Sequence, residues 1–78
     1  MPKVFQKGAY RFFFVSSDGD EPYHIHVREG KRIAKFWMDP VRLQKNTGFT
    51  PNQLRQIEKL IKAQHEQIKE AWNEYFSS

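Results

Sequence analysis

The side chains best suited to chemistry lie in one short run, EPYHIHVR at residues 21–28. Side chains alternate between the two faces of a β-strand, so this run predicts that His24, His26 and Arg28 share a face. Histidine is the side chain whose unperturbed pKa lies nearest neutrality. Two imidazoles beside a guanidinium can bind a metal ion, contact a phosphate or carry out acid/base catalysis, and the run leaves these uses open.

Short extended segments must position this run. From Val4 to about Lys45 the chain is rich in Phe, Tyr, Val and Ile, which strands prefer. Turn residues interrupt it, and the predicted turns lie at residues 7–9, 16–22, 29–31 and 39–40. The last segment, residues 41–45, is either a strand or one helical turn, and we favour the strand. Residues 1–46 are therefore predicted to form a small, mainly antiparallel sheet of four to five short strands.

A single long helix is predicted for residues 50–76. The sequence TPNQ at residues 50–53 places an N-cap threonine before a first-turn proline, with glutamine at the third helical position. Apolar residues then recur at spacings of three and four, interrupted once at Gln64. The stripe consists of Leu54, Ile57, Ile61, Ile68, Trp72 and Tyr75.

The length of this helix has a consequence for its end. A continuous helix of about 26 residues is roughly 39 Å long, whereas a typical strand is about 17 to 20 Å long. We therefore expect Trp72, Tyr75 and Phe76 to lie beyond the sheet, where aromatic side chains favour binding of a partner protein or of a second copy of the chain.

These elements predict an α+β fold in which a small sheet packs against one long C-terminal helix. The 78 residues are expected to form one domain. The absence of cysteine excludes disulfides and thiolate zinc sites. We see neither a signal peptide nor an apolar stretch long enough to span a membrane. We expect a cytoplasmic protein that uses no cofactor and has no membrane partner.

The predicted sheet has two distinct faces. One alternating set is apolar and is expected to pack under the helix; it consists of Tyr10, Phe12, Phe14, Ile25, Val27, Ala34, Phe36 and Met38. The opposite set mixes aromatic and basic residues; it consists of Arg11, Phe13, Val15, His24, His26, Arg28, Ile33, Lys35 and Trp37. The choice of core face follows from the cost of burying unpaired imidazoles and guanidinium groups, which is several kcal/mol.

The charge distribution points to an acidic partner for the sheet. Residues 1–48 hold nine Lys and Arg against five Asp and Glu, so they carry the whole net charge of +4. Arg11, Phe13, Arg28, Lys35 and Trp37 are therefore predicted binding residues. Their mixture of rings and cations suits either a protein interface or single-stranded nucleic acid, RNA or DNA. Phe13 and Trp37 can instead form a minor second core under a loop.

The two strand histidines have three possible roles. They can be structural, held by hydrogen bonds; they can act on a phosphate as an acid/base pair; or they can bind a metal ion. A metal site needs further ligands at fixed spacing, and neither His65 nor the acidic residues near 18–21 supply one. We therefore predict no metal site and treat His24 and His26 as catalytic candidates.

Several segments together resemble the bacterial domain-of-unknown-function family numbered 4160. They are residues 1–4 (MPKV), 10–14 (YRFFF), 21–27 (EPYHIHV), 34–40 (AKFWMDP), 48–49 (GF) and 70–76 (EAWNEYF). Family members usually carry two prolines before the first histidine, and Tyr23 departs from this pattern. The resemblance implies membership of two-gene modules with another small family, numbered 2442, in an arrangement similar to toxin and antitoxin pairs.

These observations lead to three functional hypotheses. The first is a component of a bacterial toxin–antitoxin type module that binds a partner protein encoded nearby, or a second copy as a dimer. The second is a small metal-independent ribonuclease toxin in which His24 and His26 are acid and base while Arg11, Arg28 and Lys35 hold the phosphate. The third is a nucleic-acid-binding regulator without catalysis.

Overall fold

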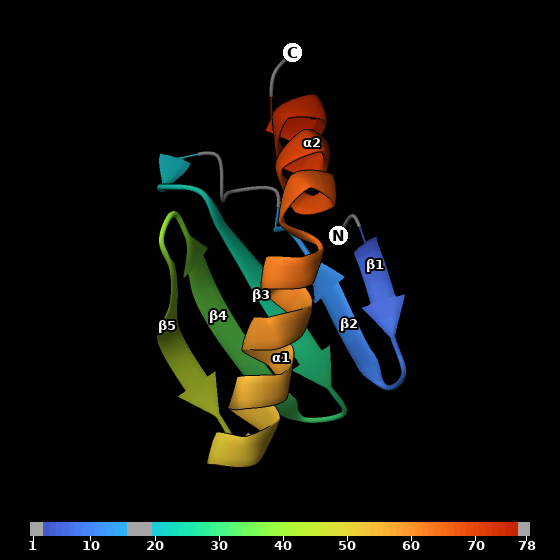
Figure 1. The fold of residues 1–78 in the computed structure, drawn as a ribbon, viewed down its shortest axis with the longest axis vertical. Helices are drawn as coiled ribbons and strands as arrows, with labels where there is room; N and C mark the ends of the chain where they lie inside the picture. The colour runs from blue at the N-terminus through green and yellow to red at the C-terminus, as the bar shows by residue number, and fades with distance from the viewer. Residues whose placement is uncertain (1–2, 16–19, 77–78) are drawn as a thin grey trace.

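The chain folds as a five-stranded antiparallel sheet with helices on one face, in a computed structural model that describes residues 3–15 and 20–76 (Figure 1). The strands lie in chain order, and each pairs with the next. The elements are β1 (Lys3–Lys7), β2 (Tyr10–Phe13), β3 (His24–Glu29), β4 (Arg32–Met38), β5 (Val41–Thr47), α1 (Pro51–Ala63) and α2 (His65–Phe76). The predicted α+β class and antiparallel sheet are confirmed.

Tight turns connect β1 to β2, β3 to β4 and β4 to β5 where the sequence predicts them. Gly8, between β1 and β2, and Gly30, between β3 and β4, have φ of 58° and 61°, a conformation that favours glycine. Residues 41–45 belong to a strand, as predicted. The turn predicted for residues 16–22 falls partly on residues 16–19, which lie outside the described part of the chain.

The core lies between the sheet and the helices, on the predicted face. Its buried apolar residues are Phe12, Phe14, Ile25, Val27, Ala34, Phe36, Met38, Phe49, Ile57, Ile61 and Ile68. Tyr10 is only partly buried, because its ring packs at the margin, with its hydroxyl donating to Gln56 Oε1 at 3.5 Å. Alternation along the strands therefore identified the core face correctly.

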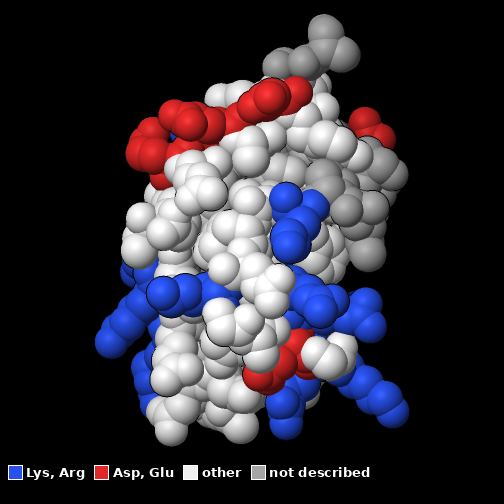
Figure 2. All heavy atoms as spheres, turned by 90° about the vertical axis from the view of Figure 1, so that its right-hand side faces the viewer, with Lys and Arg blue, Asp and Glu red and all other residues white. Residues whose placement is uncertain are grey.

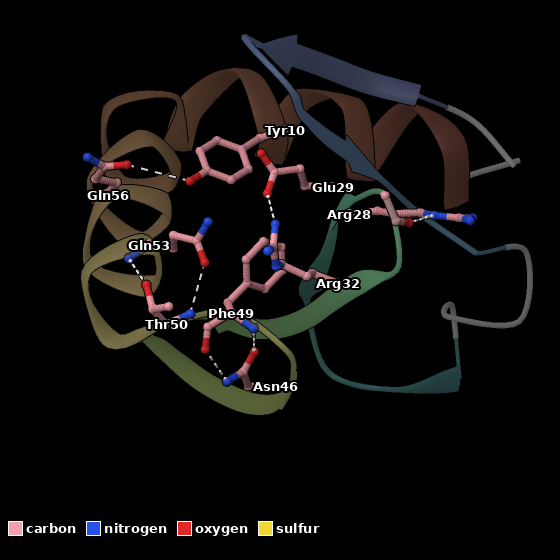
Figure 3. Close-up of polar contacts among 10 residues, drawn as sticks. Tyr10, Arg28, Glu29, Arg32, Asn46, Phe49, Thr50, Gln53 and Gln56 are labelled. Carbon is pink, nitrogen blue, oxygen red and sulfur yellow. Dashed lines mark hydrogen bonds and ion pairs between the residues drawn. The ribbon is translucent and has the colours of Figure 1, made fainter.

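The predicted capping box starts α1 (Figure 3). The hydroxyl of Thr50 accepts from the backbone N–H of Gln53 at 3.2 Å, and the side chain of Gln53 accepts from the Thr50 N–H at 2.9 Å. Just before it, the Asn46 side chain exchanges two hydrogen bonds, of 3.0 and 3.1 Å, with the backbone of Phe49. These contacts fix the path from β5 into the helix.

The prediction of one long helix is wrong, because the helical segment divides at Gln64 into α1 and α2. The backbone N–H of Gln64 is shared between the carbonyls of Leu60 (3.0 Å) and Ile61 (3.2 Å). The imidazole Nε2 of His65 donates to the Met38 carbonyl at 3.3 Å, and so ties the start of α2 to the end of β4. The division of the helix thus coincides with the gap in the apolar stripe and with a tertiary contact at the start of α2.

The change of direction brings the end of α2 onto the end of the sheet. The ring of Trp72 packs 5.3 Å from Phe14, 5.2 Å from Tyr23 and 4.3 Å from Phe76. Trp72 and Phe76 are consequently partly buried, whereas Tyr75 is 43% exposed. Of the three aromatic residues expected beyond the sheet, only Tyr75 is exposed. No helix in the described part of the chain is long and apolar enough to span a membrane.

Candidate functional site

The sheet face turned away from the helices, which we call the open face, is organised by the strand register into rows that cross the sheet. Each row contains one residue from each strand that it crosses. The middle row is Lys3, Phe13, His26, Lys35 and Lys45. The neighbouring rows are Gln6, Arg11, Arg28, Ile33 and Thr47 on one side, and His24, Trp37 and Arg42 on the other.

Two pairs of like charges lie directly opposite each other on this face. Arg11 of β2 is the register partner of Arg28 on β3, and Lys35 of β4 is the partner of Lys45 on β5. Like charges directly opposite each other on neighbouring strands are destabilising, by a few tenths of a kcal/mol up to about 1 kcal/mol. Such pairs therefore do not themselves stabilise the sheet.

Acidic side chains compensate for only part of this charge. Lys35 Nζ lies 2.5 Å from a carboxylate oxygen of Glu21. Arg28 donates from Nε to the carbonyl of Gly30 at 2.8 Å, and Figure 3 shows its side chain directed away from α1. Within residues 3–15 and 20–76, no carboxylate forms an ion pair with Arg11, Arg28 or Lys45. These three cations are available to an anion from outside the chain.

Aromatic rings lie among these cations. The rings of Phe13 and His26 stack, with centroids 5.4 Å apart and an interplanar angle of 16°. Lys35 Nζ lies 5.0 Å from the centre of the Trp37 ring, within the distance of a cation–π contact. The open face therefore presents aromatic rings next to positive charges, and the rings of Phe13, His26 and Trp37 are half-buried in the sheet.

The expectation that His24 lies on an exposed surface is wrong, because its side chain is completely buried. Its Nδ1 donates to the Pro22 carbonyl at 2.7 Å. The Trp37 ring lies 5.7 Å away on the sheet, and the Trp72 ring reaches it from α2 at 5.5 Å. Sequence alternation gave the correct face but not the burial, which depends on the position of α2.

His26 lies beside His24 but in different surroundings. The two ring centroids are 5.1 Å apart, nearly perpendicular, and only His26 is partly exposed. A substrate on the open face can contact His26 in this arrangement, whereas the His24 ring is inaccessible. Among the described residues, no group of three or more His, Cys, Asp or Glu side chains is placed to hold a metal ion.

The structure brings most of the predicted binding residues together and separates the others. Arg11, Phe13, His26, Arg28, Lys35 and Trp37 share the open face. Trp72, Tyr75 and Phe76 form an aromatic cluster at the end of α2. Sequence reasoning missed Lys3, Arg42 and Lys45, which complete the rows. Alternation of side chains along residues 41–47 was the signal that could have placed Arg42 and Lys45 on this face. A bulge in the β4–β5 pairing interrupts that alternation, so the two residues do not fit one regular pattern.

The charges of the molecule are separated along its length. Figure 2 shows most of the acidic side chains in that view at the upper end, and Lys and Arg side chains over the middle and lower parts. Helix α2 contributes acidic residues at a spacing of four, Glu66, Glu70 and Glu74, with Lys69 among them. A polyanion is therefore attracted toward the basic part of the sheet and repelled from the end of α2.

Comparison with known proteins agrees with the resemblance seen in the sequence. No curated protein and no solved structure matches the chain. Residues 9–73, which include β2 to β5, α1 and most of α2, match a family model described as a domain of unknown function, DUF4160. The chain with this basic, aromatic open face therefore belongs to the DUF4160 family.

Proposed function

We propose that the protein binds single-stranded nucleic acid, with RNA as the principal ligand, on the open face of its sheet. The observation that carries the proposal is the placement of Arg11 opposite Arg28 and of Lys35 opposite Lys45. Residues that break a local folding rule are expected at functional sites. Phosphate groups between such cations convert the repulsion into attraction.

The rings of the open face favour a single strand over a duplex. Unpaired bases can stack on aromatic side chains, and each stacked base contributes about 1 to 3 kcal/mol, whereas bases within a duplex are already stacked. Phe13, His26 and Trp37 supply rings beside cations on adjacent strands. The face also has shallow hollows, of about 510 Å³ near His26 and Lys45 and about 210 Å³ between Phe13 and the arginines.

Binding without catalysis fits this geometry better than a ribonuclease. An acid/base pair requires two groups within hydrogen-bond reach of the substrate. The His24 ring is completely buried and is held on Pro22, so only His26 meets this condition. The catalytic role of His24 and His26 remains a prediction, and incubation of labelled RNA with the protein tests it directly.

The decisive experiment measures binding of a fluorescent 12-nucleotide RNA to the protein by anisotropy at several salt concentrations. The double variant Arg11→Gln/Arg28→Gln removes two phosphate contacts. We expect its affinity for the RNA to fall at least tenfold. The plot of log K against log salt should also become less steep, its negative slope shrinking in magnitude by about 1.4, because each phosphate contact with a single-stranded nucleic acid contributes about 0.7.

A matched control separates the site from overall charge. The double variant Lys59→Gln/Lys69→Gln removes the same two charges from exposed positions on α1 and α2. It should bind RNA with an affinity within about threefold of that of the unmodified protein. Equal losses in the two double variants, or no salt-dependent binding by the unmodified protein, would contradict the proposal.

A second candidate function is binding of a partner protein within a bacterial module of toxin–antitoxin type. The specific observation is the aromatic cluster at the end of α2, where Tyr75 is 43% exposed next to Trp72 and Phe76. Exposed tyrosine beside tryptophan is typical of interface hot spots. This surface is separate from the open face, so one chain can bind a protein partner and RNA together.

A further inference from the structure

A pocket at one end of the open face is not explained by phosphate binding alone. It has a volume of about 460 Å³ and lies where the β4–β5 turn meets the segment before β3. Its lining consists of Pro22, Tyr23, Trp37, Asp39, Pro40 and Arg42. It therefore combines an indole, a carboxylate and a guanidinium in one hollow.

The charged groups of this pocket are not used by the fold. Asp39 and Arg42 line the same hollow, but they form no ion pair with each other or with any other side chain among residues 3–15 and 20–76. Both residues are exposed. Their hydrogen-bonding groups are therefore available to a ligand that carries donors and acceptors.

The indole at the pocket is held in place by its neighbours on the sheet. The His24 ring lies nearly perpendicular to the Trp37 ring at 5.7 Å, and Lys35 Nζ approaches the same ring at 5.0 Å. Arg42 is the register partner of Trp37 on β5. A planar ligand in the pocket thus meets a fixed aromatic ring rather than a mobile side chain.

We propose that this pocket binds a guanine base, with the base against Trp37, the Asp39 carboxylate accepting hydrogen bonds and the Arg42 guanidinium donating them. The inference rests on the proposed function in one respect, since it places the base at the point where an RNA strand that crosses the open face reaches the end of the sheet. The middle row and the pocket are connected through Lys35, which contacts Trp37 and lies opposite His26.

Guanine is the base whose edges match these groups. It has adjacent N1–H and N2–H donors, which a carboxylate can accept together, and the O6 and N7 acceptors that arginine contacts in pairs. Adenine and cytosine offer a carboxylate only one amino group, and uracil offers one imide N–H. A well-formed bidentate contact discriminates against the wrong base by about 5- to 150-fold.

The test compares four 12-nucleotide RNAs, oligouridine and the same strand with a single central G, A or C. Anisotropy gives their affinities for the unmodified protein, for Asp39→Asn and for the control Glu70→Gln, which removes the same charge from α2. We expect the G-containing strand to bind at least fivefold more tightly than the others. Asp39→Asn should abolish this preference, while Glu70→Gln should retain it.

A second readout uses the pocket without the strand. In Trp72→Phe, which retains an aromatic ring beside Phe14 and Tyr23, Trp37 is the sole tryptophan. GMP should quench its fluorescence more strongly than AMP at equal concentration, and Arg42→Gln should remove the difference. This arm shows whether the pocket accepts the free nucleotide as well as the base in a strand.

The outcomes separate the two proposals. If no strand binds but GMP still quenches Trp37 selectively, the nucleic-acid proposal fails and the guanine pocket stands. If all four strands bind equally and GMP quenches no more than AMP, the guanine pocket is wrong while the open-face proposal stands. A preference for G that persists in folded Asp39→Asn and Arg42→Gln variants also overturns the pocket assignment.

Discussion

His24 and His26 lie two residues apart on β3, yet their side chains differ in every respect that matters for function. His24 is enclosed by Trp37 and Trp72 and bonded to the backbone, whereas His26 stacks on Phe13 at the centre of the open face. The first belongs to the packing between sheet and helix. His26 belongs to the open face, which we propose as the ligand-binding surface.

Alanine substitution should separate these two roles. His24→Ala removes the hydrogen-bond donor of the Pro22 carbonyl and creates a cavity beside Trp72. We therefore expect the free energy of unfolding to fall by about 1 to 3 kcal/mol. His26→Ala loses one ring stack, which contributes about 0.5 to 1.5 kcal/mol, and should weaken RNA binding several-fold. Urea unfolding and anisotropy measure both effects.

His26→Phe serves as the control for the second histidine. It retains the ring against Phe13 and removes the polar nitrogens, so it distinguishes stacking from hydrogen bonding or charge. Strong binding by His26→Phe together with weak binding by His26→Ala identifies stacking as the contribution. A stable His24→Ala that loses RNA binding, with an unaffected His26→Ala, would contradict this division between a packing histidine and a ligand-binding one.

Tyr23 is half-buried, and ionisation of its buried hydroxyl opposes folding at high pH. Burial, and to a smaller extent the carboxylates of Glu66 and Asp39, raise the pKa of its phenol far above the ordinary value. Its hydroxyl has no hydrogen-bond partner among the described residues. The phenol therefore holds its proton more tightly in the folded protein than in the unfolded chain, where its pKa is about 10. This difference stabilises the folded state fully at pH values below about 10, and the stabilisation is lost as the pH rises from there through the folded-state pKa.

Unfolding in urea should therefore become easier between pH 9.5 and about pH 11.5, and Tyr23→Phe should remove part of that dependence. Below pH 9 the same variant should be as stable as the unmodified protein or slightly more stable, because it removes a buried hydroxyl without a partner. Tyr10→Phe, whose hydroxyl contacts Gln56 at the margin, is the control. Identical pH profiles for the unmodified protein and Tyr23→Phe would show that another group causes the alkaline unfolding.

At the scale of elements, the sequence predicts the features that depend on local patterns and does not predict those that depend on contacts between distant segments. Alternation in β3 identified the core side of Ile25 and Val27, because the period of a strand is set by its own backbone. The start of α1 was equally predictable, since the Thr50–Gln53 capping box is local. The position opposite Arg11 depends on the register between strands, which no single segment determines.

The break at Gln64 and the burial of His24 both involve α2. His65, at the start of α2, contacts the Met38 carbonyl, and Trp72, further along the same helix, packs against the His24 ring. The pocket residues Asp39 and Arg42 were missed because they come from a turn and an edge strand that meet only in the folded sheet. Contacts between distant segments therefore explain each of these differences.

The Arg11–Arg28 pair between β2 and β3 is expected to lower the stability of the fold while it strengthens RNA binding. Arg28→Thr replaces a like-charge partner of Arg11 by a β-branched residue that strands favour. We expect the free energy of unfolding to rise by about 0.2 to 1 kcal/mol at low salt, less at high salt, while RNA affinity falls. Arg55→Thr on α1 is the control and should lower stability slightly. A loss of stability in Arg28→Thr at low salt would show that the pair does not oppose folding.

At the scale of the whole molecule, the basic sheet and the acidic α2 have surface charges that suit different kinds of partner. The open face suits a polyanion, whereas the α2 surface adds exposed Tyr75 to a stripe of glutamates. A protein partner for α2 is therefore expected to contribute basic residues around an apolar centre. Self-association through the same surface has to overcome repulsion between the two acidic stripes.

We expect Tyr75→Glu to weaken binding of the protein partner at least tenfold without affecting RNA affinity by more than about threefold, since hot-spot tyrosines contribute about 2 kcal/mol or more. Sedimentation of the chain alone and with the product of the neighbouring gene measures association. Lys69→Glu, an exposed charge change on the same helix, is the control. A chain that stays monomeric at high concentration and does not bind the neighbouring gene product would contradict a role for this surface.

The order of the elements also affects how the protein is made. All five strands are sequential neighbours, so the sheet closes only short loops and is expected to form early. The helices that cover Phe12, Ile25 and Phe36 follow the sheet in the chain, so they leave the ribosome after it. During that interval we expect the nascent chain to expose the apolar face of its sheet, so translation speed past residue 50 and access to chaperones should affect the yield of folded protein.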